Sequence, residues 1–152
     1  MKTMVAAALI AASGTILAWT AQETPETQEV SYPEALKPGF EKLLAGENET
    51  ALKAWLKGGP IEGDSYIRKL KPAFDQVNGL FGKPVDYSWI KDFTFGARSK
   101  VAFAVVNAER GAFFLKFTLY RTPKGSWVVN PLVINTEIEE VATGGYLEKL
   151  ID

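Results

Sequence analysis

The hydrophobic and polar positions along the chain change their period near Pro84. Before this proline, apolar side chains recur at steps of three and four residues, which is the spacing of one face of an α-helix. This spacing predicts helices over residues 40–44, 51–56 and 64–81, and it is most regular in the third. The first half of the fold is therefore expected to be helical.

Polar and special residues predict where these helices begin and end. Asn48 and Asp64 stand just before the second and third helical patterns, so each is expected to act as an N-cap. Gly82 is expected to end the third helix, because glycine is common after the last helical residue. Pro72 lies inside the third pattern and is expected to kink or split that helix, because it has no amide hydrogen to donate.

After Pro84 the apolar positions alternate with a period of two, which predicts β-strands. Four segments show this alternation, and they are separated by short links. The predicted strands cover residues 87–95, 100–107, 112–121 and 127–135.

Glycines in the links between the later strands set the expected pairing. Residues 109–111 and 123–125 are both typical of three-residue hairpin loops. A three-residue first loop places Phe103 opposite Phe117 on a wholly apolar face of the sheet. The second face is then expected to carry Ala102, Ala104, Phe114, Lys116 and Tyr120.

The last predicted strand contains a proline, which cannot donate a hydrogen bond to a neighbouring strand. Pro131 is therefore expected at an edge or at a β-bulge. A bulge at Asn130-Pro131 shifts the alternation by one residue. The residues expected to face the core are then Trp127, Val129, Leu132 and Ile134.

Helices followed by antiparallel strands indicate an α+β fold. We expect N-terminal helices packed on one face of a curved, bulged antiparallel sheet of four or more strands. The segment 114–127 (FLKFTLYRTPKGSW), followed by VVNPLVIN, is similar to a pattern in small exported bacterial proteins of unknown function. The layout also resembles the cystatin-like, cone-shaped fold of the NTF2-like superfamily. The likeness covers about residues 64–136 and rests on hydrophobic and turn residues, so it implies a fold and not a chemistry.

The first 21 of the 152 residues are typical of a signal peptide. Lys2 is followed by an apolar run over residues 5–12, which is the order of the basic and hydrophobic regions of such peptides. The alternative is an uncleaved membrane anchor, because residues 3–22 carry no charge, and only then is the membrane a partner. Residues 22–38 are acidic and proline-rich and predict a flexible leader, which leaves residues 39–152 as a single α+β domain. The expected location is the periplasm or the cell exterior.

The composition excludes several kinds of site. The chain has no cysteine and no histidine, so disulfides, thiol chemistry, iron–sulfur clusters and imidazole ligands or bases are ruled out. Seventeen basic residues against 18 acidic residues give a formal net charge of -1, which argues against nucleic-acid binding. We therefore expect no metal, no cofactor and no nucleic-acid partner.

Aromatic residues are the candidates for lining a pocket between the helices and the sheet. Asp92 is the strand carboxylate nearest to them, but simple alternation places it on the face opposite Trp89, so that it needs a local bulge to enter. The alternative is that these rings are ordinary core. The pocket candidates are Tyr66, Trp89, Phe117 and Trp127.

The second face of the sheet is a candidate interface. Small alanines beside aromatic rings and the Lys116 stem predict a flat, half-apolar surface of the kind that a partner or a second copy covers. The alternative is that the Lys116 stem covers the alanines in a solvated monomer. The interface candidates are Ala102, Ala104, Phe114, Lys116 and Tyr120.

Three functions follow from these observations. The first is an exported, non-enzymatic domain that binds a small apolar ligand or a protein partner through the sheet. The second is implied by the resemblance, because the superfamily includes isomerases and dehydratases, and it would use Tyr66 and Asp92 for proton transfer without a metal. The third is a dimerisation or assembly module, with a homodimer formed through the sheet face.

Overall fold

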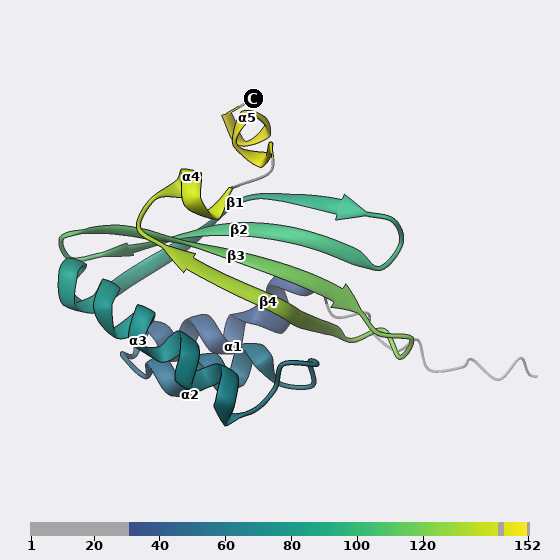
Figure 1. Cartoon of the computed structure of the whole chain (residues 1–152), viewed down its shortest axis with the longest axis horizontal. Coiled ribbons are helices and arrows are strands. Elements are labelled where there is room, and N and C mark those ends of the chain that lie inside the picture. Colours follow the sequence, from purple (N-terminus) through teal and green to yellow (C-terminus); the bar gives the residue numbers. More distant parts are fainter. Residues whose placement is uncertain (1–30, 143–144, 152) are drawn as a thin grey trace, which may run out of the picture.

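The computed structural model describes residues 31–142 and 145–151 of the chain (Figure 1). The predicted signal peptide, residues 1–21, and residues 22–30 of the predicted leader lie outside the described residues. The elements are α1 (Tyr32–Leu44), α2 (Asn48–Leu56), α3 (Asp64–Phe81), β1 (Pro84–Phe95), β2 (Ser99–Ala108), β3 (Gly111–Arg121), β4 (Trp127–Asn135), α4 (Ile138–Val141) and α5 (Tyr146–Ile151).

The four strands form one antiparallel sheet in the order β1-β2-β3-β4. Helices α1–α3 lie against one face, which we call the inner face, and the short helices α4 and α5 lie over the other, the outer face (Figure 1). This arrangement confirms the expected α+β class, with N-terminal helices on one face of a bulged antiparallel sheet. Among the described residues, no helix is both long enough and apolar enough to cross a membrane.

Helix α1 begins at Tyr32, inside the segment that the sequence assigned to a flexible leader. Pro33 lies in the first turn, where a missing amide hydrogen removes no helical hydrogen bond. Leu36 and Phe40 of the same helix are buried in the main core, and their burial favours an ordered helix despite the acidic, proline-rich composition. Residues 32–38 are therefore helical and belong to the domain, which corrects the expected boundary.

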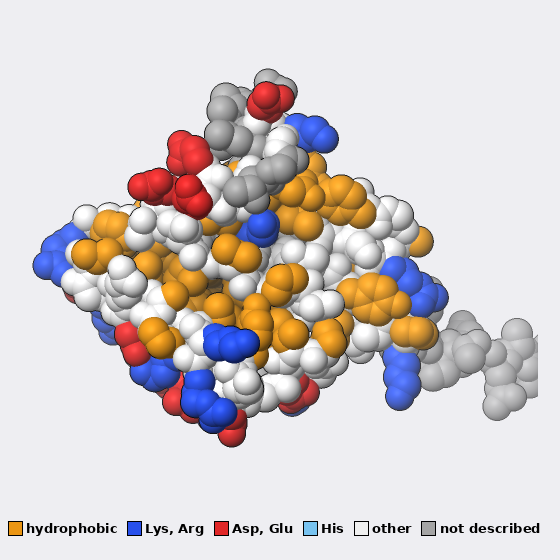
Figure 2. Space-filling view, in the orientation of Figure 1, with side chains coloured by type: hydrophobic (Ala, Val, Ile, Leu, Met, Phe, Trp, Pro, Cys, Tyr) orange, Lys and Arg blue, Asp and Glu red, His pale blue; other side chains and the backbone are white. Residues whose placement is uncertain are grey.

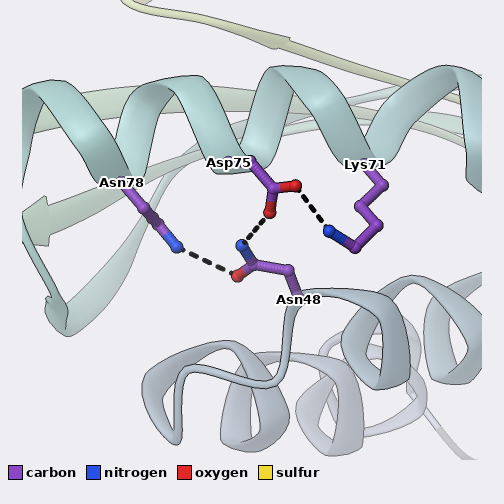
Figure 3. Close-up of polar contacts among 4 residues, drawn as sticks. All are labelled: Asn48, Lys71, Asp75 and Asn78. Atoms are coloured by element: carbon purple, nitrogen blue, oxygen red, sulfur yellow. Dashed lines mark hydrogen bonds and ion pairs between the residues drawn. The ribbon is translucent and has the colours of Figure 1, made fainter.

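Asn48 is the first residue of α2, but it does not cap that helix as predicted. Its side chain reaches α3, where the amide nitrogen donates to Asp75 Oδ1 at 3.1 Å and the oxygen accepts from Asn78 Nδ2 at 3.1 Å (Figure 3). Lys71 Nζ donates to the second carboxylate oxygen of Asp75 at 2.5 Å. The predicted cap is instead a polar bridge between two helices.

Helix α3 is continuous from Asp64 to Phe81 and runs through Pro72 without a break. The predicted split at Pro72 is therefore wrong. Burial of Ile67 before the proline and of Phe74 after it holds both halves against the core, which offsets the lost hydrogen bond. Asp64 is the first helical residue, and the helix has no side-chain cap.

The loop between β2 and β3 is shorter than predicted. Ala108 pairs with Gly111, so the loop contains two residues, 109–110, rather than three. Gly111 is the first residue of β3, and a Cβ atom there would approach the ring of Phe81 at 2.5 Å. The glycine is therefore needed for the close approach of α3 and not for the conformation of the turn.

This difference of one residue exchanges the two faces of β2 relative to β3. Ala102 pairs with Phe117, and both side chains lie on the inner face, as does Ala104. Phe103 pairs with Lys116 on the outer face. The alanines of β2 thus make room for large side chains of β3 beneath the helices, and they do not leave a flat outer surface.

The predicted bulge in β4 is confirmed. Asn130 and Pro131 together oppose the single residue Thr118 of β3, between the pairs formed by Val129 and Leu132. The extra residue shifts the alternation, so that apolar side chains on both sides of the bulge face the helices. All four residues predicted to face the core pack in it, namely Trp127, Val129, Leu132 and Ile134.

The main core lies between the inner face and helices α1–α3, and aromatic rings fill much of it. The indole of Trp55 packs over Gly39, and its Nε1 donates to the carbonyl oxygen of Leu36 at 2.9 Å. The ring of Phe40 stacks on that of Tyr87 with 3.8 Å between the ring centroids. These contacts bind α1 to α2 and to the sheet.

Candidate functional site

A bulge in β1 turns Asp92 toward the helices. In the pairing of β1 with β2, Ile90 is an extra residue between Trp89 and Lys91. The extra residue shifts the alternation by one, so Asp92, which pairs with Ala102, shares the inner face with Trp89. The local bulge that Asp92 needs in order to reach the helix side is therefore present.

Tyr32, the first residue of α1, contacts residues from both edge strands of the sheet. Its ring packs edge-on against Trp89 of β1 at 5.5 Å and against Trp127 of β4 at 6.3 Å between centroids. Its hydroxyl lies beside the carboxylate of Asp92, whose charge raises the pKa of the phenol, and Lys100 Nζ of β2 lies 5.5 Å from the centre of its ring. We call the four residues around this ring, Trp89, Asp92, Lys100 and Trp127, the Tyr32 seat.

The charged members of the Tyr32 seat form a partly buried ion pair. Lys100 Nζ lies 3.1 Å from Asp92 Oδ2 and 2.8 Å from Thr94 Oγ1. The side chains of Lys100 and Asp92 are 24% and 36% exposed, so solvent screens this pair less than a pair on the open surface. The carboxylate of Asp92 therefore accepts a hydrogen bond from the Lys100 ammonium and lies beside the Tyr32 phenol.

The Tyr32 hydroxyl has an altered acidity. Burial, the charge of Asp92 and the interaction of the hydroxyl with that carboxylate together raise the pKa of Tyr32 to about 12, and burial is the largest cause. The phenol is therefore protonated near neutral pH and acts as a hydrogen-bond donor. Because efficient acid–base catalysis needs a pKa near the working pH, this arrangement suits holding a ring and a hydroxyl in place.

The four predicted pocket residues are divided between the Tyr32 seat and the core. Trp89 and Trp127 belong to the seat, where both are half-buried. Phe117 is fully buried under α1 and α2, with the rings of Phe40, Trp55 and Trp89 at 5.4 to 5.9 Å. Tyr66 packs on the main core elsewhere, and its hydroxyl donates to the carbonyl oxygen of Leu132 at 3.5 Å.

Tyr32 itself and Lys100 of the Tyr32 seat are not among the residues singled out from the sequence. Tyr32 falls within the supposed leader, although Pro33 after it and the helical spacing of Leu36 and Phe40 are signals of a helix start. Lys100 begins the second predicted strand, and its face depends on the register with β3. No feature of the sequence alone distinguishes it from a solvated lysine.

The predicted interface residues are also divided by the sheet. Ala102 and Ala104 are fully buried on the inner face, which corrects their placement beside Lys116. Phe114, Lys116 and Tyr120 lie on the outer face, at alternate positions of β3. Tyr120 is 40% exposed, and Phe95 on the same face of β1 is 49% exposed.

The C-terminal helices cover part of the outer face. Val141 and Ala142 pack with Val101 and Phe103 in a second buried cluster. The ring of Tyr146 at the start of α5 lies 5.5 Å from that of Phe103. Figure 2 shows hydrophobic side chains along the sheet beside this C-terminal segment, while charged side chains are frequent over the helices on the opposite side.

A shallow depression of about 350 Å³ lies at the junction of α2 and α3. Leu56 and Ile67 form its apolar part, and Lys57, Glu62 and Asp64 lie among its charged residues. Mixed charges of both signs give it no preference for a ligand of one charge. In the part of the chain that the structure describes, no group of three or more acidic residues is placed to hold a metal ion.

Comparison with known proteins finds a similar solved structure but no matching family. No protein-family profile and no curated protein matches the chain. The chain is similar to the crystal structure of a Campylobacter jejuni protein named as an NTF2-like transpeptidase, at 16% sequence identity and a TM-score of 0.48. The match covers 65% of this chain and 97% of that one. The arrangement described above, with helices on one face of a four-stranded antiparallel sheet, agrees with the α+β layout expected from the sequence.

Proposed function

We propose that this protein is an exported, non-enzymatic binding domain that holds a protein partner on the outer face of its sheet. The interface consists of Phe95, Phe114, Lys116 and Tyr120, which we call the outer patch. The observation that carries the proposal is the exposure of two large rings, Phe95 and Tyr120, on that face. Both pair with Ser99, so they flank one small residue in the same row of the sheet.

The chemistry of the outer patch favours a protein over a small molecule. Side chains that stand on the face of a sheet form a broad surface, whereas small ligands bind mainly in concave sites. Exposed aromatic rings are enriched in protein interfaces, and a lysine whose stem lies among them can keep its charge in water at the rim. Lys116 is half-buried between Phe114 and Tyr120 along β3.

The packing of the inner face supports a binding role over catalysis. The space in which an NTF2-like enzyme would hold a substrate is occupied here by the rings around Phe117. The two residues that would transfer protons have other partners, because Tyr66 donates to a backbone carbonyl and Asp92 accepts from Lys100. Export is supported by the basic and apolar order of the first 21 residues.

Site-specific crosslinking in the native host tests this proposal. A photoreactive phenylalanine analogue at position 120 is compared with the same analogue at position 124, an exposed position in the turn after β3. We expect position 120 to crosslink to one defined protein in the exported fraction, either a second copy or another chain, and position 124 to give no such product.

Self-association is measured separately, because a second copy is the simplest partner. Sedimentation of the mature domain over a range of concentrations measures dimer formation. We expect Tyr120→Glu to abolish the dimer and Lys124→Glu to leave it unchanged. The proposal is overturned if the photoreactive analogue gives no crosslink at position 120 or, in a second variant, at position 95, and the domain sediments as a monomer at every concentration.

A further inference from the structure

The Tyr32 seat has the composition of a ligand site, and a side chain of the same chain occupies it. Trp89 and Trp127 approach the Tyr32 ring edge-on from the two edge strands of the sheet. Lys100 lies over its face, and the carboxylate of Asp92, which is an acceptor for a hydroxyl proton, lies beside its hydroxyl. Each of these residues matches one property of a phenol. The tryptophans suit its flat apolar ring, Lys100 suits the negative face of the ring, and Asp92 suits the hydroxyl donor.

Tyr32 is attached to the rest of the domain less firmly than the residues that follow it. It is the first residue of α1, and Ser31 before it supplies no side-chain cap to the helix. One turn later the helix is held independently, because Leu36 and Phe40 are buried and the carbonyl oxygen of Leu36 accepts from Trp55 Nε1. Unwinding of the first turn would therefore free the Tyr32 ring and leave the remainder of α1 in place.

We infer that the Tyr32 seat is a binding site for a phenol group and that Tyr32 is its displaceable occupant. The ligand is either a free phenolic compound or a tyrosyl side chain of a polypeptide, since both present the same ring and hydroxyl. Displacement of Tyr32 leaves a space with the same four neighbours for the incoming ring. This site lies on the inner face and is separate from the outer patch, so the inference does not rest on the proposed function.

Binding of p-cresol, which is the tyrosine side chain without its backbone, is the direct test. The probe is titrated into the wild-type domain, Tyr32→Phe and Tyr32→Ala, with Tyr120→Phe as a control that removes a phenol hydroxyl outside the seat. The indole N–H signals of Trp89 and Trp127 in NMR spectra report where the probe binds. Toluene, which has the same ring without the hydroxyl, measures how much the hydrogen bond to Asp92 contributes.

We expect p-cresol to shift both indole signals in the wild-type domain, with weak affinity because Tyr32 competes for the same space. Tyr32→Ala should bind p-cresol about tenfold or more tightly than the wild type, and it should prefer p-cresol to toluene by about tenfold or more, because the hydroxyl meets a charged acceptor. Asp92→Asn in the Tyr32→Ala background should reduce this preference. Tyr120→Phe should bind p-cresol as the wild type does.

Two results would overturn the inference. One is equal affinity of Tyr32→Ala for p-cresol and toluene, which would mark an unspecific apolar hole. The other is binding to Tyr32→Ala with no indole shift in the wild-type domain at saturating p-cresol, which would make Tyr32 a permanent part of the core. If Tyr32→Ala does not fold, Tyr32→Phe is the deciding variant. The phenylalanine ring has no hydroxyl to interact with Asp92, so it should compete less strongly and the affinity for p-cresol should increase. An unchanged affinity contradicts displacement.

Blocked tyrosine, N-acetyl-tyrosinamide, separates the two sources of the phenol. Binding of both p-cresol and the blocked amino acid supports a tyrosyl side chain carried by a polypeptide. Binding of p-cresol alone supports a free phenolic compound, because the seat then has no room for a peptide backbone.

Discussion

The hydroxyl of Tyr32 lies beside the carboxylate of Asp92, and this contact joins the first turn of α1 to β1. The two residues face each other only because the extra residue Ile90 rotates Asp92 to the inner face. The bulge in β1 thus creates the polar contact between this strand and the start of α1.

The stability of the domain should fall in strong alkali through the titration of Tyr32. Its pKa rises from 10.0 to about 12 on folding, so the folded state holds the phenol proton more tightly than the unfolded state does. The stabilisation is complete below pH 10.0 and is lost as the pH rises toward about 12. Urea unfolding at several pH values should show a smaller alkaline loss of stability in Tyr32→Phe than in the wild type. An identical pH dependence of the two proteins would contradict the raised pKa of Tyr32, of which burial is the largest cause.

The core position of Phe117 predicts a large cost of truncation. Phe117→Ala should reduce the free energy of unfolding by about 3–5 kcal/mol, because the ring is fully buried and leaves a cavity. Phe95→Ala is the matched control, since it removes the same atoms from a side chain that is half exposed. Chemical denaturation should show a markedly smaller loss for Phe95→Ala, and equal losses would contradict the assignment of the two faces.

Two glycines in helices should respond to alanine in opposite directions. A Cβ atom at Gly39 would lie 2.2 Å from Nε1 of Trp55, so Gly39→Ala must displace the indole and should cost about 1–3 kcal/mol. Gly79 of α3 has no atom within 4 Å of an added Cβ, so Gly79→Ala should stabilise the domain by about 0.5–1 kcal/mol through helix propensity. Thermal unfolding of the two variants checks the signs, and a stabilising Gly39→Ala would exclude the close packing of α1 on Trp55.

The polar bridge between α2 and α3 should contribute to stability mainly through Asn48. Asn48→Ala removes two hydrogen bonds to α3, to Asp75 and from Asn78, and should cost about 1–2 kcal/mol. Lys71→Ala removes an ion pair whose side chains are both exposed, so it should cost about 0.5 kcal/mol or less. Urea unfolding of both variants tests this order, and a larger effect of Lys71→Ala would show that the ion pair within α3 contributes more than the hydrogen bonds between the helices.

The elements of this fold are predictable because two periods in the sequence are strong. The steps of three and four in α3 persist across Pro72, and the alternation after Pro84 marks four strands. The bulge at Asn130-Pro131 is also predictable, because a proline within a strand cannot donate a hydrogen bond to its neighbour and therefore favours an edge or a bulge. Local chemistry is sufficient for these features.

The register of β2 with β3 and the start of α1 depend on contacts between distant residues. Gly111 resembles a turn glycine in the sequence, but its role is the close approach of Phe81 from α3. Tyr32 follows a polar, proline-rich segment, and its order comes from rings and charges on strands far along the chain. The sequence therefore identifies Trp89 and Trp127 as pocket candidates and predicts that Asp92 joins them only if β1 contains a bulge. It does not identify Tyr32, the residue that all three surround.

Three successive residues of β1 hold opposite ends of the described chain. Asp92 faces inward and receives Tyr32, while Lys91 Nζ donates to the carbonyl oxygen of Lys149 in α5, and the ring of Phe93 lies 5.3 Å from that of Tyr146. The edge strand β1 thus contacts two segments that lie on different faces of the sheet. Detachment of β1 would therefore release both segments at once, whereas the first turn of α1 can also unwind alone.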